Sequence, residues 1–190
     1  KALLDNGEKA NLQTFIEEII SRNLRNSIFV DITANDAVAA VYDQLLKKSI
    51  AVVACNKVAA SSPYQQYRQL KDLAREYNSR FLFETNVGAG LPVIATLNDL
   101  VHSGDRVHQI QAVLSGTLNF VFNNYDGSRP FAEVVRQAQE EGYTEPDPRL
   151  DLGGTDVMRK IMILAREAGV KIEMDDITNH SFMPPACMQG

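Results

Sequence analysis

The chain has 190 residues, of which 45% are hydrophobic and 23% are charged, and its formal net charge is −5. This composition is that of a globular protein with room for one large domain or two small ones. The excess of acids argues against nucleic-acid binding, which needs clustered Lys and Arg, and no apolar run is long enough to span a membrane. The first residues lack the layout of a secretory signal, so the sequence predicts a cytoplasmic protein.

The first half of the chain alternates helical and strand patterns. Three short apolar runs predict strands, and a segment with helical spacing of apolar residues precedes each of them. In chain order the segments are a helix at 11–22, a strand at 27–35, a helix at 36–49, a strand at 50–57, a helix at 63–79 and a strand at 80–85. This alternation is typical of βαβ units. Residues 1–85 are therefore predicted to form the back half of a doubly wound, Rossmann-type nucleotide-binding domain with a parallel sheet.

Polar residues follow two of these predicted strands. Thr33 lies at the end of the first strand, and Lys57 follows the second. The carboxyl ends of parallel strands share one edge of a sheet, and ligands bind at that edge. Both residues are candidates for cofactor contact. A lysine at a solvated strand end is the simpler explanation of Lys57, and the sequence leaves both explanations open.

The second half of the chain has a different pattern. It predicts a helix at 91–104, an alternating strand at 107–114, a glycine turn within 115–127 and a helix at 130–142. We expect residues 86–190 to form a second α/β domain with a mixed or antiparallel sheet.

The stretch FLFETNVGAGLPVI (81–94) resembles the start of a dinucleotide fingerprint, G-x-G-x-x-G. The third glycine is missing, because Val93 occupies its position. Pro92 has no N–H to offer a phosphate. The stretch is better interpreted as a sharp turn between the two halves of the chain.

The densest polar stretch is residues 142–169, in which several acids precede Lys160. A helix is predicted from Thr155, and it places Asp156 and Lys160 one turn apart on one face. An exposed pair of this kind contributes only about 0.3–0.5 kcal/mol. A partly desolvated lysine beside carboxylates is instead a candidate proton donor. The residues alone favour neither the surface ion pair nor the proton donor. The predicted core stripe of this helix is Val157, Ile161, Leu164 and Ala168.

Five stretches in chain order resemble one family, the homoserine dehydrogenases, including those fused to aspartokinase. They are VDITAND, CNKVAASS, ETNVGAGLPVI, VLSGTLNFVF and GYTEPDPRLDLGGTDVMRK, which together span residues 30–160. The resemblance implies a homodimer that uses NAD or NADP to interconvert L-aspartate 4-semialdehyde and L-homoserine in threonine and methionine biosynthesis.

The resemblance also implies roles for individual residues. Lys160 matches the acid–base lysine, Lys57 a second lysine near the nicotinamide and substrate, and Asp156 a residue that orients Lys160. The implied substrate contacts are Glu145, Asp151, Asp156, Gly116, Thr117 and Tyr143, and the implied cofactor contacts are Thr33, Ala34, Lys57 and Gly142. The implied sodium ligands are the Glu84 carboxylate and the main-chain carbonyls of Val87, Ala89 and Leu91.

The resemblance makes residues 86–190 an α/β substrate, catalytic and dimerisation domain that is incomplete at the C-terminus. It covers only part of a family member. The family's glycine-rich loop is expected before residue 1 and its C-terminal return segment after Gly190, so truncation at both ends is predicted. One alternative is a dimerising fragment without activity of its own. Another is a semialdehyde dehydrogenase, which needs an activated cysteine. Neither Cys55 nor Cys187 lies in a recognisable motif, and Cys55 is expected to be a buried strand residue. The choice between NAD and NADP and the presence of a fused aspartokinase stay open.

Overall fold

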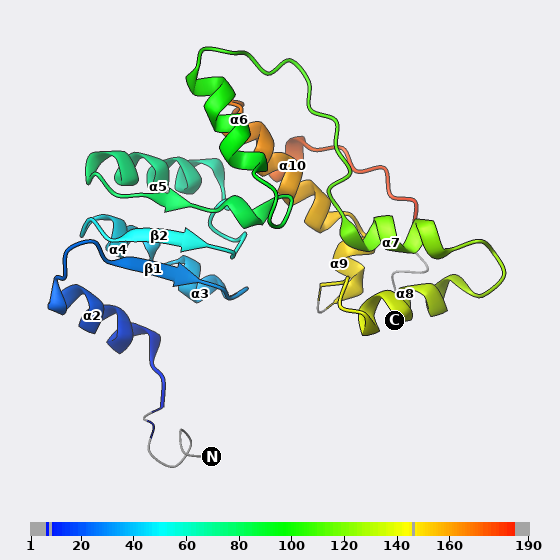
Figure 1. Cartoon of the computed structure of the whole chain (residues 1–190), viewed down its shortest axis with the longest axis horizontal. Helices are drawn as coiled ribbons and strands as arrows, with labels where there is room; N and C mark the ends of the chain where they lie inside the picture. The colour runs from blue at the N-terminus through cyan, green and yellow to red at the C-terminus, as the bar shows by residue number, and fades with distance from the viewer. Residues whose placement is uncertain (1–6, 8, 146, 185–190) are drawn as a thin grey trace. The chain divides into compact units, whose positions relative to one another are not determined.

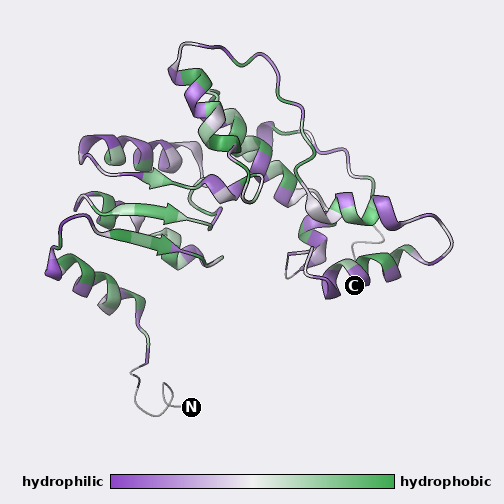
Figure 2. Cartoon of the chain, in the orientation of Figure 1, coloured by the Kyte–Doolittle hydropathy of each residue, from purple (hydrophilic) through white to green (hydrophobic). Residues whose placement is uncertain are grey.

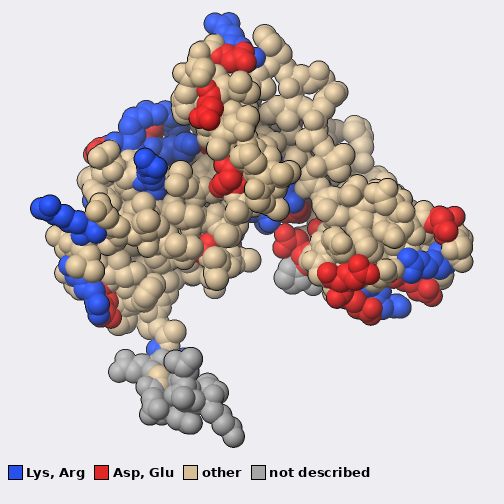
Figure 3. Space-filling model, in the orientation of Figure 1, with Lys and Arg blue, Asp and Glu red and all other residues tan. Residues whose placement is uncertain are grey.

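The computed structural model describes residues 7, 9–145 and 147–184, so Cys187 lies outside the described residues. The chain forms two compact units, residues 1–86 and 87–190 (Figure 1). On the face shown in Figure 3, charged side chains of both signs are scattered over each unit. Among the described residues, no helix is long and apolar enough to cross a membrane.

The first unit is built on a parallel three-stranded sheet with the order β1-β2-β3. The strands are β1 (Ile28–Asp31), β2 (Ala51–Ala54) and β3 (Phe81–Leu82), and the helices are α2 (Leu12–Arg22), α3 (Asp36–Ala39), α4 (Tyr42–Leu46) and α5 (Tyr64–Glu76). All three predicted strands are present, and all the predicted helices. The helix expected at 36–49 is divided into α3 and α4. A short 3-10 helix, η1 (Glu84–Asn86), follows β3.

A row of aromatic rings fills one side of this sheet. The Tyr42 ring lies 6.4 Å from that of Phe29 on β1 and 5.8 Å from that of Phe81 on β3, and Tyr42 is fully buried. Side chains alternate between the two faces of a strand, so the neighbours of Phe29 point the other way. Ile28 and Val30 are indeed exposed. Strand β1 therefore has one packed face and one exposed apolar face. Figure 2 shows the hydrophobic colouring of β1 and β2.

The second unit consists of helices. They are α6 (Val93–His102), α7 (Gly116–Asn124), α8 (Phe131–Glu140), α9 (Pro148–Leu152) and α10 (Thr155–Glu167), with a 3-10 helix, η2 (Met174–Asp176). The helices predicted at 91–104 and 130–142 and the helix start near Thr155 are confirmed by α6, α8 and α10.

The strand predicted at 107–114 is wrong, and so is the mixed or antiparallel sheet expected for this unit. The described part of the unit contains no strand, and residues 105–115 have no regular secondary structure. A strand needs a hydrogen-bonded neighbour. The alternating pattern of 107–114 fits a strand, but no described segment of the unit pairs with it.

Two short helices were missed in the sequence. The turn expected within 115–127 is largely α7, because the Ser115 side chain caps the helix by accepting a hydrogen bond from the Leu118 N–H at 3.0 Å. The loop before Thr155 contains α9, in which Asp147 is the N-cap and Pro148 occupies the first turn. Both helix starts use a side-chain cap that is visible in the sequence.

Two groups of buried apolar side chains stabilise the second unit. Val121 of α7 packs with Val134 and Ala138 of α8. In α10 the buried apolar residues are Met162, Ile163 and Leu164. The predicted α10 stripe is therefore only partly right, since Leu164 is buried, whereas Val157, Ile161 and Ala168 are half-buried.

Candidate active site

Lys160 and Asp156 form an ion pair on α10. The Lys160 Nζ lies 2.6 Å from the Asp156 Oδ2, and the two side chains are only 17% and 8% exposed. The same Nζ donates a hydrogen bond to the Leu114 carbonyl at 2.9 Å. The interpretation of this pair as an exposed surface bridge is therefore wrong. The carbonyl and carboxylate hold the ammonium group in one place.

The start of α10 fixes the position of this pair. Gly154 precedes the helix with a φ of +82°, a conformation that favours glycine. A Cβ at this position would lie 3.1 Å from the Asn179 Oδ1. The Asn179 Nδ2 in turn donates to the Gly153 carbonyl at 2.7 Å. Gly154 lets the chain turn closely against Asn179 before Asp156 enters the first helical turn.

Lys160 faces a cavity of about 400 Å³ within the second unit. The cavity is lined by Gly88, Ala89, Val113, Leu114, Ser115, Gly116, Asn119 and Lys160. Gly116 is the first residue of α7, so the positive end of that helix borders the cavity. An ammonium group and a helix N-terminus both stabilise negative charge. The cavity thus suits a group whose oxygen becomes negative.

A second polar cluster joins α7, the loop at 143–145 and α9. Asp151 is only 3% exposed, and its Oδ2 accepts a hydrogen bond from the Glu145 N–H at 2.8 Å. The Thr117 Oγ1 lies 2.8 Å from the Asp151 Oδ1 and 2.6 Å from the Tyr143 carbonyl oxygen. Burial raises the pKa of Asp151, and the charges of Asp156 and Glu145 raise it further, against the hydrogen bonds from Glu145 and Thr117, which lower it.

The remaining predicted substrate and cofactor residues of this unit lie beside that cluster. The Tyr143 ring is half-exposed and stacks on Phe120 with ring centroids 4.5 Å apart. Gly142 is exposed, has a φ of +79° and ends α8 through a hydrogen bond to the Gln139 carbonyl. The structure therefore brings Glu145, Asp151, Thr117 and Tyr143 into one network. Lys160 and Gly116 line one cavity, and Asp156 is paired with Lys160.

The predicted cofactor residues of the first unit lie in the loops that follow β1 and β2. Thr33 and Ala34 are exposed just beyond β1, and half-buried Lys57 lies three residues beyond β2. The Ser61 hydroxyl donates to the Lys57 carbonyl at 2.8 Å. All three residues thus follow the carboxyl ends of parallel strands, as expected for a ligand edge.

The predicted cation ligands are divided between the two units. Glu84 lies in η1 of the first unit, whereas Val87, Ala89 and Leu91 open the second. Gly88 has a φ of +81°, and a Cβ there would lie 2.6 Å from Val93. The Leu91 N–H donates to the Gly88 carbonyl at 3.0 Å. The glycine of this stretch is therefore required by a tight turn.

Comparison with known proteins places both units in one family. The family model described as "Homoserine dehydrogenase, NAD binding domain" matches residues 2–84, and the model "Homoserine dehydrogenase" matches residues 92–184. The chain belongs to the homoserine dehydrogenase family. The resemblance seen in the sequence motifs and the α/β class with a parallel sheet are thereby confirmed.

Similar proteins include two bifunctional aspartokinase/homoserine dehydrogenases. Chloroplastic enzyme 2 of Arabidopsis thaliana is 45% identical over 183 residues, which are 96% of this chain and 20% of that protein. Enzyme 2 of Escherichia coli (strain K12) is 44% identical over 163 residues, which are 86% of this chain and 20% of that protein. The chain thus spans about a fifth of the length of these curated relatives.

A solved structure shares the fold of this homoserine dehydrogenase family member. It is a hyperthermophilic archaeal homoserine dehydrogenase in complex with NADPH, with a TM-score of 0.71 and 28% sequence identity. The match covers 85% of this chain and 48% of the archaeal chain.

Sequence reasoning missed two polar residues in the motifs of this chain, Asp31 and Asn56. Asp31, at the end of β1, is 1% exposed and accepts hydrogen bonds from the Thr33 N–H at 2.7 Å, the Asn56 Nδ2 at 3.0 Å and the Tyr42 hydroxyl. The Asn56 Nδ2 also donates to the Asn35 carbonyl at 3.0 Å. Burial raises the pKa of Asp31, but these hydrogen bonds outweigh it and hold that pKa below its usual value. A polar residue at the end of each buried strand was the signal.

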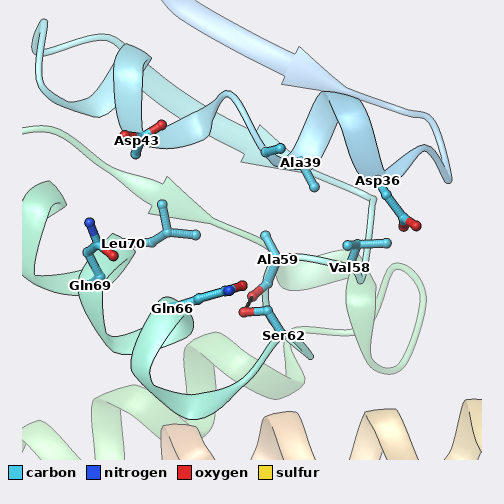
Figure 4. A pocket seen from close by; sticks show the side chains of 10 residues that line it. Asp36, Ala39, Asp43, Val58, Ala59, Ser62, Gln66, Gln69 and Leu70 are labelled. Carbon is cyan, nitrogen blue, oxygen red and sulfur yellow. Dashed lines mark hydrogen bonds between the residues drawn. The ribbon is translucent and has the colours of Figure 1, made fainter.

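A separate cavity of about 520 Å³ lies in the first unit (Figure 4). It is lined by residues of α3, α4, α5 and the turn at 58–62, and Asp36 and Asp43 stand at opposite ends of it. No predicted site residue of the homoserine dehydrogenase family is among the residues that line it. Cys55, expected to be buried, is exposed, because it follows the last residue of β2.

Proposed function

We propose that the protein containing this chain is a homoserine dehydrogenase, which reduces L-aspartate 4-semialdehyde to L-homoserine with NADPH or NADH. The observation that carries this proposal is the Lys160–Asp156 pair, mostly buried and open to a cavity of about 400 Å³. Family membership supports the reaction class. Because the chain spans about a fifth of its curated relatives, the activity is assigned to the whole protein.

The reaction needs a donor where negative charge develops. When bound, the nicotinamide supplies a hydride to the aldehyde carbon. The π electrons of the C=O bond move onto oxygen, and a proton must reach that oxygen to give the alcohol. Lys160 is positioned to donate that proton from its ammonium group, and Asp156 and the Leu114 carbonyl orient it. Gly116, at the start of α7, adds the positive end of a helix.

We assign the amino-acid end of the substrate to the neighbouring cluster. The substrate ammonium requires a carboxylate, and its carboxylate requires donors. Glu145 and Tyr143 come from one loop beside α7, next to Thr117. The Lys57 side chain, in the first unit, is proposed to act near the nicotinamide and substrate.

The first unit has the features of a cofactor-binding edge. Thr33 and Ala34 lie in an exposed loop at the carboxyl edge of a parallel sheet, and the buried Asp31 holds the start of that loop through the Thr33 N–H. These residues fit a dinucleotide. An archaeal relative in complex with NADPH supports NADP or NAD as the cofactor, with Gly142 as a further proposed contact.

We propose residues 1–85 as the back half of the nucleotide-binding domain and 86–190 as the substrate and dimerisation domain. The uncovered apolar face of β1 supports the first assignment, since parallel sheets are normally covered on both faces. The rest of the parent protein would cover it.

We propose four further properties on the basis of the similarity to the family. They are a homodimer, an aspartokinase domain in the same protein, a cytoplasmic location, and a sodium ion bound by oxygens of Glu84, Val87, Ala89 and Leu91. The names of the Arabidopsis and Escherichia coli relatives support the kinase. The Arabidopsis relative is named chloroplastic. Cell fractionation, which shows whether the protein lies in the cytoplasm or in a plastid, tests the proposed location.

Replacing Lys160 with alanine tests the proposed function. Loss of a general acid lowers turnover by about 10²- to 10⁴-fold. Semialdehyde-dependent NADPH oxidation by the full-length protein should therefore fall by that factor in Lys160→Ala. The matched control is Lys171→Ala, which removes an exposed lysine after α10 and should leave turnover unchanged. Equal turnover in the two variants would remove Lys160 from its role.

A further inference from the structure

The hydroxyl group of Thr117 has more acceptors than it has protons. Its Oγ1 lies 2.6 Å from the Tyr143 carbonyl oxygen and 2.8 Å from the Asp151 Oδ1. Both distances are those of full O–H···O hydrogen bonds. A threonine hydroxyl carries one proton, and a carbonyl oxygen has none to give. One more proton is needed for both contacts to be hydrogen bonds.

Only Asp151 can supply that proton. If its Oδ1 is protonated, it donates to the Thr117 Oγ1, and Thr117 is then free to donate to the Tyr143 carbonyl. The other oxygen, Oδ2, still accepts from the Glu145 N–H at 2.8 Å. Every polar atom of the cluster then has a partner of the right kind. If Asp151 is ionised, one of the two short contacts joins two oxygen atoms with no proton between them, and their lone pairs repel each other at a buried site.

We propose that Asp151 is a protonated acid in the folded protein, and that it is a positioning residue rather than the carboxylate that receives the substrate ammonium. The second half of this proposal rests on the proposed function. Asp151 ties the start of α7 and the loop that carries Tyr143 and Glu145 to α9. The substrate ammonium is then assigned to Glu145, the other acid of that loop.

The charges around Asp151 support a proton on it. Burial raises the pKa of Asp151 most, and the negative charges of Asp156 and Glu145 raise it further. The neighbouring cations are engaged with other acids, Arg149 with Asp147 at 2.9 Å and Lys160 with Asp156 at 2.6 Å. The α7 helix, which packs against α9, contains no ionisable side chain. The elements around Asp151 therefore favour the neutral form.

Asparagine is a close mimic of a protonated aspartic acid, and this gives a sharp test. In Asp151→Asn the amide nitrogen donates to Thr117 and the amide oxygen accepts from Glu145. In the full-length protein we expect its KM for semialdehyde and its kcat to stay within about threefold of wild type, because no hydrogen bond is lost. Glu145→Gln should raise KM by about 100-fold, because it removes a charge partner of the ammonium. Asp151→Ala, which breaks the cluster, should lower kcat and raise KM together.

The protonation state is read separately, without substrate. The infrared difference between wild type and Asp151→Asn at pH 7 should show the C=O stretch of a protonated carboxyl group. A carboxylate stretch in its place would overturn the proposal, whether or not the protein is a homoserine dehydrogenase. So would a 100-fold rise of KM in Asp151→Asn with little change in Glu145→Gln, and so would an Asp151→Asn protein that does not fold.

Discussion

Asp31 and Asp151 are buried aspartates in different units, and their surroundings act on them in opposite directions. They are 1% and 3% exposed. Asp31 accepts from Thr33, Asn56 and Tyr42, and its pKa is lowered. Asp151 accepts one backbone hydrogen bond and lies against a Thr117 hydroxyl that also contacts the Tyr143 carbonyl, and its pKa is raised.

The difference shows that hydrogen-bond donors decide in which direction the pKa of a buried aspartate moves. Burial acts in the same direction on both groups, and it is the largest influence on each. At Asp31 the donors outweigh it. At Asp151 they do not, and nearby acids oppose ionisation further. In each unit the aspartate holds a loop that carries predicted ligand contacts.

Of the changes that test this comparison, replacing Asp31 should have the largest effect on stability. Asp31→Ala leaves the buried Tyr42 hydroxyl without its acceptor and removes one acceptor of the buried Asn56 amide, and each unsatisfied buried group costs about 1–3 kcal/mol. We expect the first unit to lose about 3 kcal/mol, which makes amide hydrogen exchange in β1 and β2 about 100-fold faster. Glu76→Ala, an exposed change on α5, is the control and should alter exchange little. Equal protection in the two variants would contradict the role of Asp31.

A smaller effect separates the two aspartates by pH. Asp31 has a lowered pKa when folded, so its contribution to stability is present above its unfolded pKa, near 3.8, and is lost as pH falls through the folded value. Asp151 has a raised pKa when folded, so its contribution is present at low pH and is lost as pH rises from near 3.8 through the folded value. Replacing each by asparagine removes its own pH dependence. The free energy of unfolding of wild type, Asp31→Asn and Asp151→Asn is measured with urea across this pH range. Relative to wild type, Asp31→Asn should remove a rise of stability with pH, and Asp151→Asn should remove a fall of stability with pH. Changes of the same sign in the two variants would contradict the comparison.

Local patterns predicted the first unit well. Its strands and helices were predicted from short apolar runs and from the helical spacing of apolar residues. Both patterns depend only on residues close together in the chain. The strand at 107–114 failed because pairing depends on a distant partner, and α7 was missed because the Ser115 cap was overlooked.

The sequence predicted which residues belong to the site better than it predicted their burial and their contacts with one another. Lys160 and Asp156 are one turn apart, so their pairing follows from the sequence, but their burial depends on α10 packing in the fold. The family resemblance placed Asp151 at the substrate, where a carboxylate can pair with an ammonium. Its burial and its contact with Thr117, 34 residues away in the chain, arise only when α7 and α9 meet.

The most direct test of the central claim, that Lys160 supplies the proton for carbonyl reduction, is chemical rescue. Turnover of Lys160→Ala in the full-length protein is measured with increasing methylamine, a small amine that fits a cavity of about 400 Å³ and whose ammonium form replaces the missing donor. The account predicts that turnover rises with the concentration of the amine, while Lys171→Ala does not respond. A Lys160→Ala protein with wild-type turnover and no response to the amine would contradict it.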